Sequence, residues 1–448
     1  MKAERISTKV VILGLVFLFL VGCVSGGKTY TASGIVVDPQ GNGIGDVNLA
    51  FENFGFAKTD AEGKWVKSGL SGNVKVVLEK EGLWFSTYTV SEASSSVESI
   101  GYTGIDNIQE AIDAAEDGEI ITVPPGIYYE NIDFNGKNIT LTSIDPEDPE
   151  VVAATIIDGG ESGAVVCICS GETNAVLTGF TITNGSGFST HVDYGGGVYI
   201  MDSTAVISHN IIEKNRADHG GGICLNSWFA CTIESNIMRD NVALYNGGGL
   251  FIESGQHLIS NNIISDNHAY LIGGGGITIF HGRNTLEGNI ISNNIAPAGG
   301  GIIISTVYTV PCDQINKITG NHLENNRAKS GGGLYVEGFL DAQQITDNVF
   351  RGNVVMDNGG GIYFVRCIAN AKGNVMVNNE ATLGGGLCLT DSDIILTANE
   401  FNANYAFIGC AFWKNSNSSL TGGDGNSLSA DNDDNEYIDL LPYDGPRY

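Results

Sequence analysis

The sequence has little proline, with 9 residues, and little positive charge, with 22 Lys and Arg against 51 Asp and Glu. The low proline content excludes a collagen-like chain, and the many aliphatic side chains exclude a disordered one. The formal charge of −29 excludes nucleic acid as a partner, because phosphate binding requires a basic surface. It also disfavours capture of polyanionic sugars through ion pairs. The abundant residue is glycine, with 62 of 448 residues, about 14% against an average near 7%.

Long hydrophobic runs are also scarce. An apolar stretch over residues 10–20 follows three basic residues, and it is shorter than the roughly 20 residues that span a bilayer. It leads into Leu20, Val21, Gly22 and Cys23, a run that resembles the bacterial lipobox. The resemblance implies a signal peptide over residues 1–22, acylation of Cys23 (palmitate among the chains), and an anchor in the bacterial cell envelope, at the outer membrane or cell surface. An ordinary secretory signal is the alternative.

The cysteines do not form a metal-binding pattern. No two of them are spaced as CxxC, and no histidine stands beside them at zinc-ligand spacing, so no metal site is predicted. Export permits disulfides, but we expect scattered buried thiols. Beyond Cys23 the cysteines are Cys167, Cys169, Cys224, Cys231, Cys312, Cys367, Cys388 and Cys410.

Residues 28–96 predict a small β domain. Short runs alternate in the strand period over 33–37, 47–51, 74–78 and 84–88, with turn residues between them. The order GxVxDxxGxGIxxVxL, TDxxGxW and GLxGxVxV resembles the carboxypeptidase-regulatory β-sandwich family, which implies a non-catalytic spacer or binding unit. The Ser-rich residues 91–99 are interpreted as a linker.

Residues 101–430 predict a right-handed parallel β-helix. Apolar side chains at 108, 111, 112 and 115 share one helical face, with Asp106 as the expected N-cap and Gly118 as the expected end. Strand patterns at 120–123, 127–132 and 139–141 follow. This succession resembles the capped start of pectin-lyase-like β-helices, in which the helix closes the open end of the core. The predicted fold class is therefore all-β: a parallel β-helix solenoid preceded by a small β-sandwich.

A repeat near 25 residues supports this fold. Asparagine pairs five residues apart precede the glycine triplets, and we expect Asn and Gly to form ladders and left-handed corners. Such repeats also resemble bacterial surface β-helix proteins, including polymorphic outer-membrane proteins. The triplets end at Gly197, Gly222, Gly249, Gly276, Gly301, Gly333, Gly361 and Gly386, with a degenerate copy at Gly409-Cys410-Ala411.

The strand after each triplet supplies the candidate ligand-binding residues. Its first and third residues are apolar and face the core, so its second residue faces outward. Stacked coils would bring Tyr199, Phe251, Tyr335 and Tyr363 into an aromatic column suited to sugar rings or a partner surface. The alternative is that a loop covers them or that they pack against each other.

Carboxylates lie beside this column. Asp193 and Asp218 occupy one repeat position on adjacent coils, so they could serve hydrolysis or hold Ca²⁺. Further acids are Asp202, Glu253, Glu337 and Asp391. No cofactor is indicated with certainty, and Ca²⁺ stays an open alternative. Residues 431–448 are interpreted as an acidic C-terminal cap or tail.

The sequence therefore favours a surface lipoprotein that binds extracellular polysaccharide or a cell-surface protein. The motif blocks typical of polygalacturonases, pectin methylesterases and pectate lyases are missing from the sequence. A polysaccharide lyase or glycoside hydrolase is the alternative, and a purely structural rod is a third hypothesis.

Overall fold

The computed structural model describes residues 28–85, 87–102, 104–187, 194–306, 315–338, 341–422 and 425–428. The predicted signal peptide, Cys23, Asp193, Cys312 and the acidic tail over 431–448 lie outside the described residues. The chain divides into two compact units: residues up to Lys80 with Thr87–Gly101, and Glu81–Ser86 with the residues from Tyr102 onward. Neither helix of the described ranges is long and apolar enough to span a bilayer.

The first unit consists of two sheets, in the orders β4-β1-β7 and β3-β2-β5-β6. Val36, Leu49, Trp65 and Val76 are buried in it. The serine-rich segment expected to be a linker contains β7, which pairs in parallel with β1, so that expectation is wrong. The strands are β1 (Tyr30–Val37), β2 (Asn48–Phe51), β3 (Gly55–Lys58), β4 (Lys64–Leu70), β5 (Val74–Glu79), β6 (Tyr88–Val90) and β7 (Ser96–Ile100).

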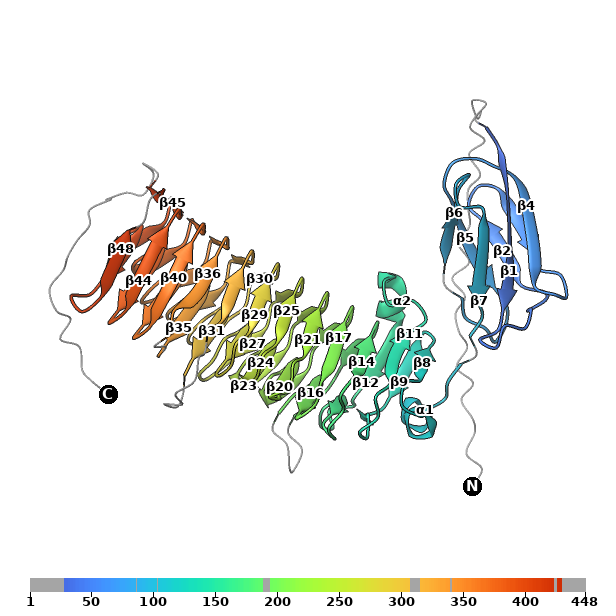
Figure 1. Ribbon diagram of the computed structural model, residues 1–448, viewed down its shortest axis with the longest axis horizontal. Helices are drawn as coiled ribbons and strands as arrows, with labels where there is room; N and C mark the ends of the chain where they lie inside the picture. The colour runs from blue at the N-terminus through green and yellow to red at the C-terminus, as the bar shows by residue number, and fades with distance from the viewer. Residues whose placement is uncertain are drawn as a thin grey trace, which may run out of the picture. The chain divides into compact units, whose positions relative to one another are not determined.

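The second unit is a parallel β-solenoid made of three long sheets (Figure 1). The first sheet follows the glycine triplets and has 11 strands. They are β10 (Ile132–Asp133), β13 (Val166–Ile168), β16 (Val198–Met201), β20 (Ile223–Asn226), β24 (Leu250–Ser254), β28 (Ile277–Ile279), β31 (Ile302–Ser305), β35 (Leu334–Glu337), β39 (Ile362–Val365), β43 (Leu387–Thr390) and β47 (Phe412–Lys414).

The second sheet comes next within each coil and has 12 strands. They are β8 (Ile120–Val123), β11 (Thr140–Ser143), β14 (Ala175–Thr178), β17 (Ala205–Ser208), β21 (Thr232–Glu234), β25 (Leu258–Ser260), β29 (Thr285–Glu287), β32 (Lys317–Thr319), β36 (Gln343–Thr346), β40 (Ile368–Lys372), β44 (Asp393–Thr397) and β48 (Ser419–Gly422).

The third sheet also has 12 strands. They are β9 (Gly126–Tyr129), β12 (Thr155–Asp158), β15 (Thr181–Thr183), β18 (Ile211–Glu213), β22 (Ile237–Arg239), β26 (Ile263–Ser265), β30 (Ile290–Ser292), β33 (His322–Glu324), β37 (Val349–Arg351), β41 (Val375–Val377), β45 (Glu400–Asn402) and β49 (Ser427–Leu428).

Two short sheets lie on the connection from the third sheet back to the glycines. One contains β19 (Arg216–His219), β23 (Val242–Asn246) and β27 (His268–Ala269). The other contains β34 (Arg327–Ala328), β38 (Val354–Val355), β42 (Glu380–Leu383) and β46 (Tyr405–Ile408).

Helix α1 (Ile108–Ala114) closes one end of the solenoid core, as predicted. Ile108 and Ile112 are fully buried in the continuous core cluster. Asn107, not Asp106, caps the helix through its side chain, and Lys137 donates to the carbonyls of Ile112, Asp113 and Ala115 at the other end. The helix ends before Gly118, at the extended C-cap residue Ala115, and Lys137 satisfies carbonyls that the helix end leaves free. Helix α2 (Pro149–Ala154) lies between β11 and β12.

The asparagine pairs form two buried ladders, which confirms that part of the expectation. The ladder asparagines themselves are not left-handed. The left-handed residue is the one before them, as at Asp240 (φ 56°) and Asp266 (φ 58°). The side-chain amide of the ladder asparagine is therefore free to bond along the ladder, while the exposed residue before it adopts the left-handed conformation of the corner.

The glycine triplets have two different causes. The first glycine usually has a positive φ, as at Gly220 (67°), which a Cβ disfavours. The other two lie against the next coil: a Cβ at Gly221 would be 2.6 Å from the carbonyl oxygen of Gly248, and one at Gly222 would be 2.5 Å from that of Gly249. The second and third positions of each triplet therefore require glycine because adjacent coils stack closely there, not because the backbone is left-handed.

Candidate functional site

The residues of the predicted aromatic column are aligned by the strand register on the outer side of the first sheet. Parallel pairing aligns Tyr199 with Cys224, Cys224 with Phe251, and Tyr335 with Tyr363. The structure agrees with the alternative that these rings are covered or pack against each other: Tyr199, Phe251 and Tyr363 are buried, Phe251 to 2% exposure, and Tyr335 is half-buried. Their assignment as ligand-binding residues stays a prediction.

The chain's own connection covers the N-terminal part of the column. The imidazole of His219 lies 5.1 Å from the ring of Tyr194, 5.5 Å from that of Tyr245 and 5.1 Å from that of Phe251, measured between centroids. The ring of Phe280 also contacts that of Phe251, edge to face, at 5.1 Å between centroids. These rings exclude water from the column, which accounts for its apolar composition without a ligand.

The C-terminal part of the column is a second buried cluster. The rings of Tyr335 and Tyr363 meet edge to face at 5.2 Å and pack with Val365, Cys388 and Trp413. Burial raises the pKa of Tyr363 to about 12 and raises that of Tyr335 as well. Both hydroxyls therefore stay protonated and serve as hydrogen-bond donors and acceptors.

Most acids beside the column have structural contacts. Glu337 pairs with Arg366, and its Oε2 accepts from the Tyr335 hydroxyl at 3.3 Å. The Oδ1 atom of Asp391 accepts from the Nδ2 atoms of Asn415 and Asn417 at 2.8 and 3.0 Å. Asp218 is half-buried on β19. Since Asp193 lies outside the described residues, the predicted Asp193–Asp218 pair stays a prediction.

Glu253 differs from these acids. It is the extra residue of a β-bulge, because Leu225 pairs with Ile252 whereas Asn226 pairs with Ser254. Burial raises the pKa of Glu253, and His281 on the next coil lowers it by a smaller amount. Within the described residues its Oε2 atom is buried and accepts no hydrogen bond, and Nδ1 of His281 is likewise unpaired. Bulges re-aim side chains and recur beside functional sites. The sequence pattern could not indicate this one, because it assumes strict alternation.

Exposed aromatic side chains stand on the connections that border this part of the first sheet. Trp228 (69% exposed) and Phe229 follow β20 after one intervening residue, Ser227, on the turn toward the second sheet. Tyr270, with Leu271 and Ile272, directly follows β27, on the connection from the third sheet. Contiguous exposed apolar side chains mark interaction sites. These side chains lie outside the repeat positions, so the repeat pattern does not indicate them.

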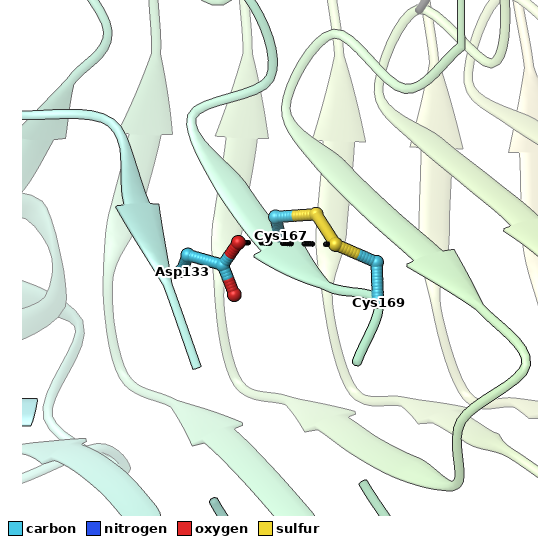
Figure 2. A group of neighbouring side chains, drawn as sticks. All are labelled: Asp133, Cys167 and Cys169. Carbon is cyan, nitrogen blue, oxygen red and sulfur yellow. Dashed lines mark hydrogen bonds between the residues drawn. A yellow bond between two sulfur atoms is a disulfide. The ribbon is translucent and has the colours of Figure 1, made fainter. Parts of the chain in front are cut away.

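The cysteines give a mixed result. Cys224, Cys231, Cys367, Cys388 and Cys410 are free and buried, as expected. The expectation is wrong for Cys167 and Cys169, which form a disulfide. Asp133 lies beside it on the preceding strand (Figure 2). Strand alternation places residues two apart on one face of a sheet, so the Cys-x-Cys spacing is the feature of the sequence that could have indicated this disulfide.

The coil geometry and its repeat define the class of protein, and comparison with known families agrees. The family described as right handed beta helix region matches residues 196–366 and 248–432, which together span more than half of the chain. The chain belongs to the right-handed β-helix family.

Other comparisons add little. No curated protein matches the sequence. A solved structure of the catalytic domain of a GH87 alpha-1,3-glucanase in complex with nigerose aligns over 89% of this chain and 89% of its own, at 11% identity and a TM-score of 0.33. A likeness of this size carries no argument about the activity of this chain.

Proposed function

We propose that this protein is a lipid-anchored β-helix protein of the bacterial cell surface that binds neutral extracellular polysaccharide. The observation that carries the proposal is the set of exposed rings of Trp228, Phe229 and Tyr270 on the connections that flank β20, β24 and β28. Flat aromatic faces stack on the apolar faces of sugar rings, and rigid aromatic side chains lose little entropy on binding.

Charge supports the choice of a neutral ligand. With a formal charge of −29, the protein repels polyanions at low ionic strength. The anchor rests on the lipobox-like run that ends at Cys23. A cell-surface protein docking on the same apolar side chains is the alternative partner.

Binding is tested with the full chain, purified in detergent, by affinity electrophoresis in gels that contain starch, β-glucan, xylan, mannan or polygalacturonate. We expect retention by at least one neutral polymer and none by polygalacturonate. Trp228→Ala, Phe229→Ala and Tyr270→Ala should each weaken retention by about tenfold, a loss of about 1.4 kcal/mol.

Phe407→Ala and Tyr405→Ala are the matched controls. Both rings are exposed, Phe407 to 83%, but they lie on β46 in the other short sheet. They should leave retention unchanged. Equal losses in both sets, or no retention by any neutral polymer, would overturn the proposal and favour a structural rod.

Cleavage of the bound polymer is a second candidate, favoured by the environment of Glu253. A half-buried carboxyl with a raised pKa suits general acid catalysis, and both Glu253 and Asp202 are close enough to Tyr199 to raise its pKa. Glu253→Gln should abolish any shortening of the polymer while retention persists. Shortening that survives this change would exclude Glu253 as the acid.

A further inference from the structure

Asp133, Cys167 and Cys169 form a compact group on the outer side of the first sheet. Asp133 on β10 pairs in register with Cys167 on β13, and Cys169 directly follows β13. One carboxylate oxygen and the two sulfurs all lie within 4.8 Å of one another. All three residues are half-buried, so small molecules can reach them. Figure 2 shows the carboxylate beside the disulfide.

This disulfide contributes little to holding the fold. It joins residues two apart in the sequence, and the chain-entropy gain of a cross-link grows with the loop that it closes. For a three-residue loop the same relation gives only about half the value for 15 residues. The strand is already held by parallel pairing with β10 on one side and β16 on the other. The cysteine pair therefore needs a reason other than stability.

The acid is oriented toward the sulfurs. The Oδ1 atom of Asp133 accepts from the backbone N–H of Asn135 at 2.7 Å, which fixes the carboxylate. Its Oδ2 atom lies 4.0 Å from the sulfur of Cys169. Glu172 and Asp113 act on the same carboxylate through their negative charges. This surrounding potential favours a cation at the group.

Two thiolates and one carboxylate are a donor set that Zn²⁺ takes in proteins, and a fourth position is left for water. We propose that Asp133, Cys167 and Cys169 form a redox-gated zinc site, closed while the disulfide is intact and opened by a thiol or phosphine reductant. Reduction breaks the S–S bond and adds two electrons and two protons to the cysteines. Two thiol groups of a thiol reductant supply them and become its disulfide, or a phosphine supplies the electrons and becomes its oxide while one water supplies the oxygen and the two protons. Binding of Zn²⁺ then releases the two thiol protons.

The test uses the full chain in detergent, titrated with Zn²⁺ in a calorimeter under argon, before and after treatment with a water-soluble phosphine that is then removed. We expect the oxidised protein to take up no zinc at this site and the reduced protein to bind one equivalent. Alkylation followed by mass spectrometry should show that zinc protects Cys167 and Cys169. Far-ultraviolet circular dichroism should be the same for both forms, because the fold does not depend on the cross-link.

Variants separate this site from other thiols. Cys167→Ser/Cys169→Ser should lose the equivalent bound after reduction. Asp133→Asn, which keeps the shape of the side chain, should weaken binding by about tenfold or more, since even outer-shell partners of a metal cost 10–100-fold. Cys224→Ala is the matched control: Cys224 lies in the same column but is buried and free, so its loss should leave zinc binding unchanged.

Three outcomes would overturn the proposal. The first is a disulfide that resists the phosphine while the protein stays folded. The second is a reduced protein that binds no more zinc than the oxidised one. The third is undiminished binding in Asp133→Asn, which remains decisive if the double variant does not fold. None of these results depends on whether the protein binds polysaccharide.

Discussion

The side-chain amide of Asn267 donates to Oδ1 of Asn294, one coil further on, at 3.1 Å. The same amide donates to the carbonyl of Met238 at 2.9 Å, and Oδ1 of Asn267 accepts from the backbone N–H of Asn241 at 3.0 Å. Asn267 is fully buried. Each ladder asparagine thus joins three successive coils through groups that have no access to water.

Asn267→Ala should therefore destabilise the solenoid by about 3 kcal/mol or more, since each buried group left unpaired costs about 1–3 kcal/mol. Thermal unfolding followed by circular dichroism measures the effect. Ser265→Ala, a half-buried position two residues earlier on β26, should change the midpoint by little. A ladder variant as stable as the serine variant would contradict this account.

Gly222→Ala should be harmful although Gly222 has no positive φ. Its Cβ would lie 2.5 Å from the carbonyl oxygen of Gly249, so adjacent coils must separate; overpacking of this kind costs about 1–3 kcal/mol or more. Gly422→Ala is the control, because no atom of the described residues lies within 4 Å of a Cβ there. Urea unfolding compares the two variants, and equal midpoints would show that coil spacing is not the cause.

His257 should make stability depend on pH. It replaces asparagine in a third ladder: its Nδ1 accepts from the N–H of Cys231 at 3.1 Å, and its Nε2 donates to the carbonyl of Ser254 at 2.6 Å. Burial lowers the pKa of His257 to about 4. In the unfolded chain the imidazole of residue 257 is protonated below about pH 6.5, whereas in the folded chain it is protonated only below about pH 4.

Stability from this group is therefore complete above pH 6.5 and falls as the pH is lowered toward 4, by up to about 3 kcal/mol. His257→Asn should remove this part of the dependence, since Asn284 fills the equivalent place on the next coil. Urea midpoints at pH 7.5 and 5 measure it. Exposed His322 supplies the control: His322→Asn should retain the wild-type slope, and a His257→Asn variant with that same slope would refute the prediction.

Phe251→Ala should lower stability by about 3–5 kcal/mol, the usual cost of removing a fully buried ring. At a temperature where the variant is still folded, its retention by polysaccharide should match that of the wild type, because the ring does not reach solvent. Tyr199→Ala and Tyr363→Ala extend the test. Retention lost in folded variants would show that the column binds the ligand after all.

Cys23→Ala should move the protein from the membrane fraction to the soluble fraction of cells, since acyl chains supply the anchor through the burial of their methylenes. Radiolabelled palmitate incorporation should disappear in the same variant. Cys224→Ala should change neither result. Membrane association that persists without Cys23 would contradict a lipid anchor there.

The sequence was sufficient to predict the solenoid because the repeat that specifies each coil lies within a short stretch of the chain. Glycine and asparagine recur where each coil turns, and the alternating apolar residues after each triplet fix which side faces the core. The column containing Tyr199 and Phe251 was also placed correctly in register. The residues that cover it were not foreseen, since Tyr194, His219 and Tyr245 lie on the connections before the triplets, and strand alternation does not say where side chains on those connections point.

The local geometry of the candidate site was less predictable. Glu253 was named as an acid beside the column, but its place as the extra residue of a bulge was not, because a bulge leaves no mark on composition. The Cys167–Cys169 bond agrees with strand alternation, which places residues two apart on the same face, whereas the CxxC spacing typical of metal sites is absent from the sequence. In the first unit, β7 was hidden because Ser and Glu are poor strand formers, and pairing with β1 outweighs that preference.

The degenerate triplet Gly409-Cys410-Ala411 has a consequence for how such an array can grow. The carbonyl oxygens of Cys410 and Ala411 approach the α-carbons of Gly385 and Gly386 so closely that a Cβ there would lie at 2.7 and 2.5 Å. A coil stacked beyond β47 would meet the Cβ atoms of Cys410 and Ala411 in the same way. Gene duplication can lengthen the rod at its inner coils, where glycine recurs, whereas this edge of the first sheet is closed to head-to-tail polymerisation.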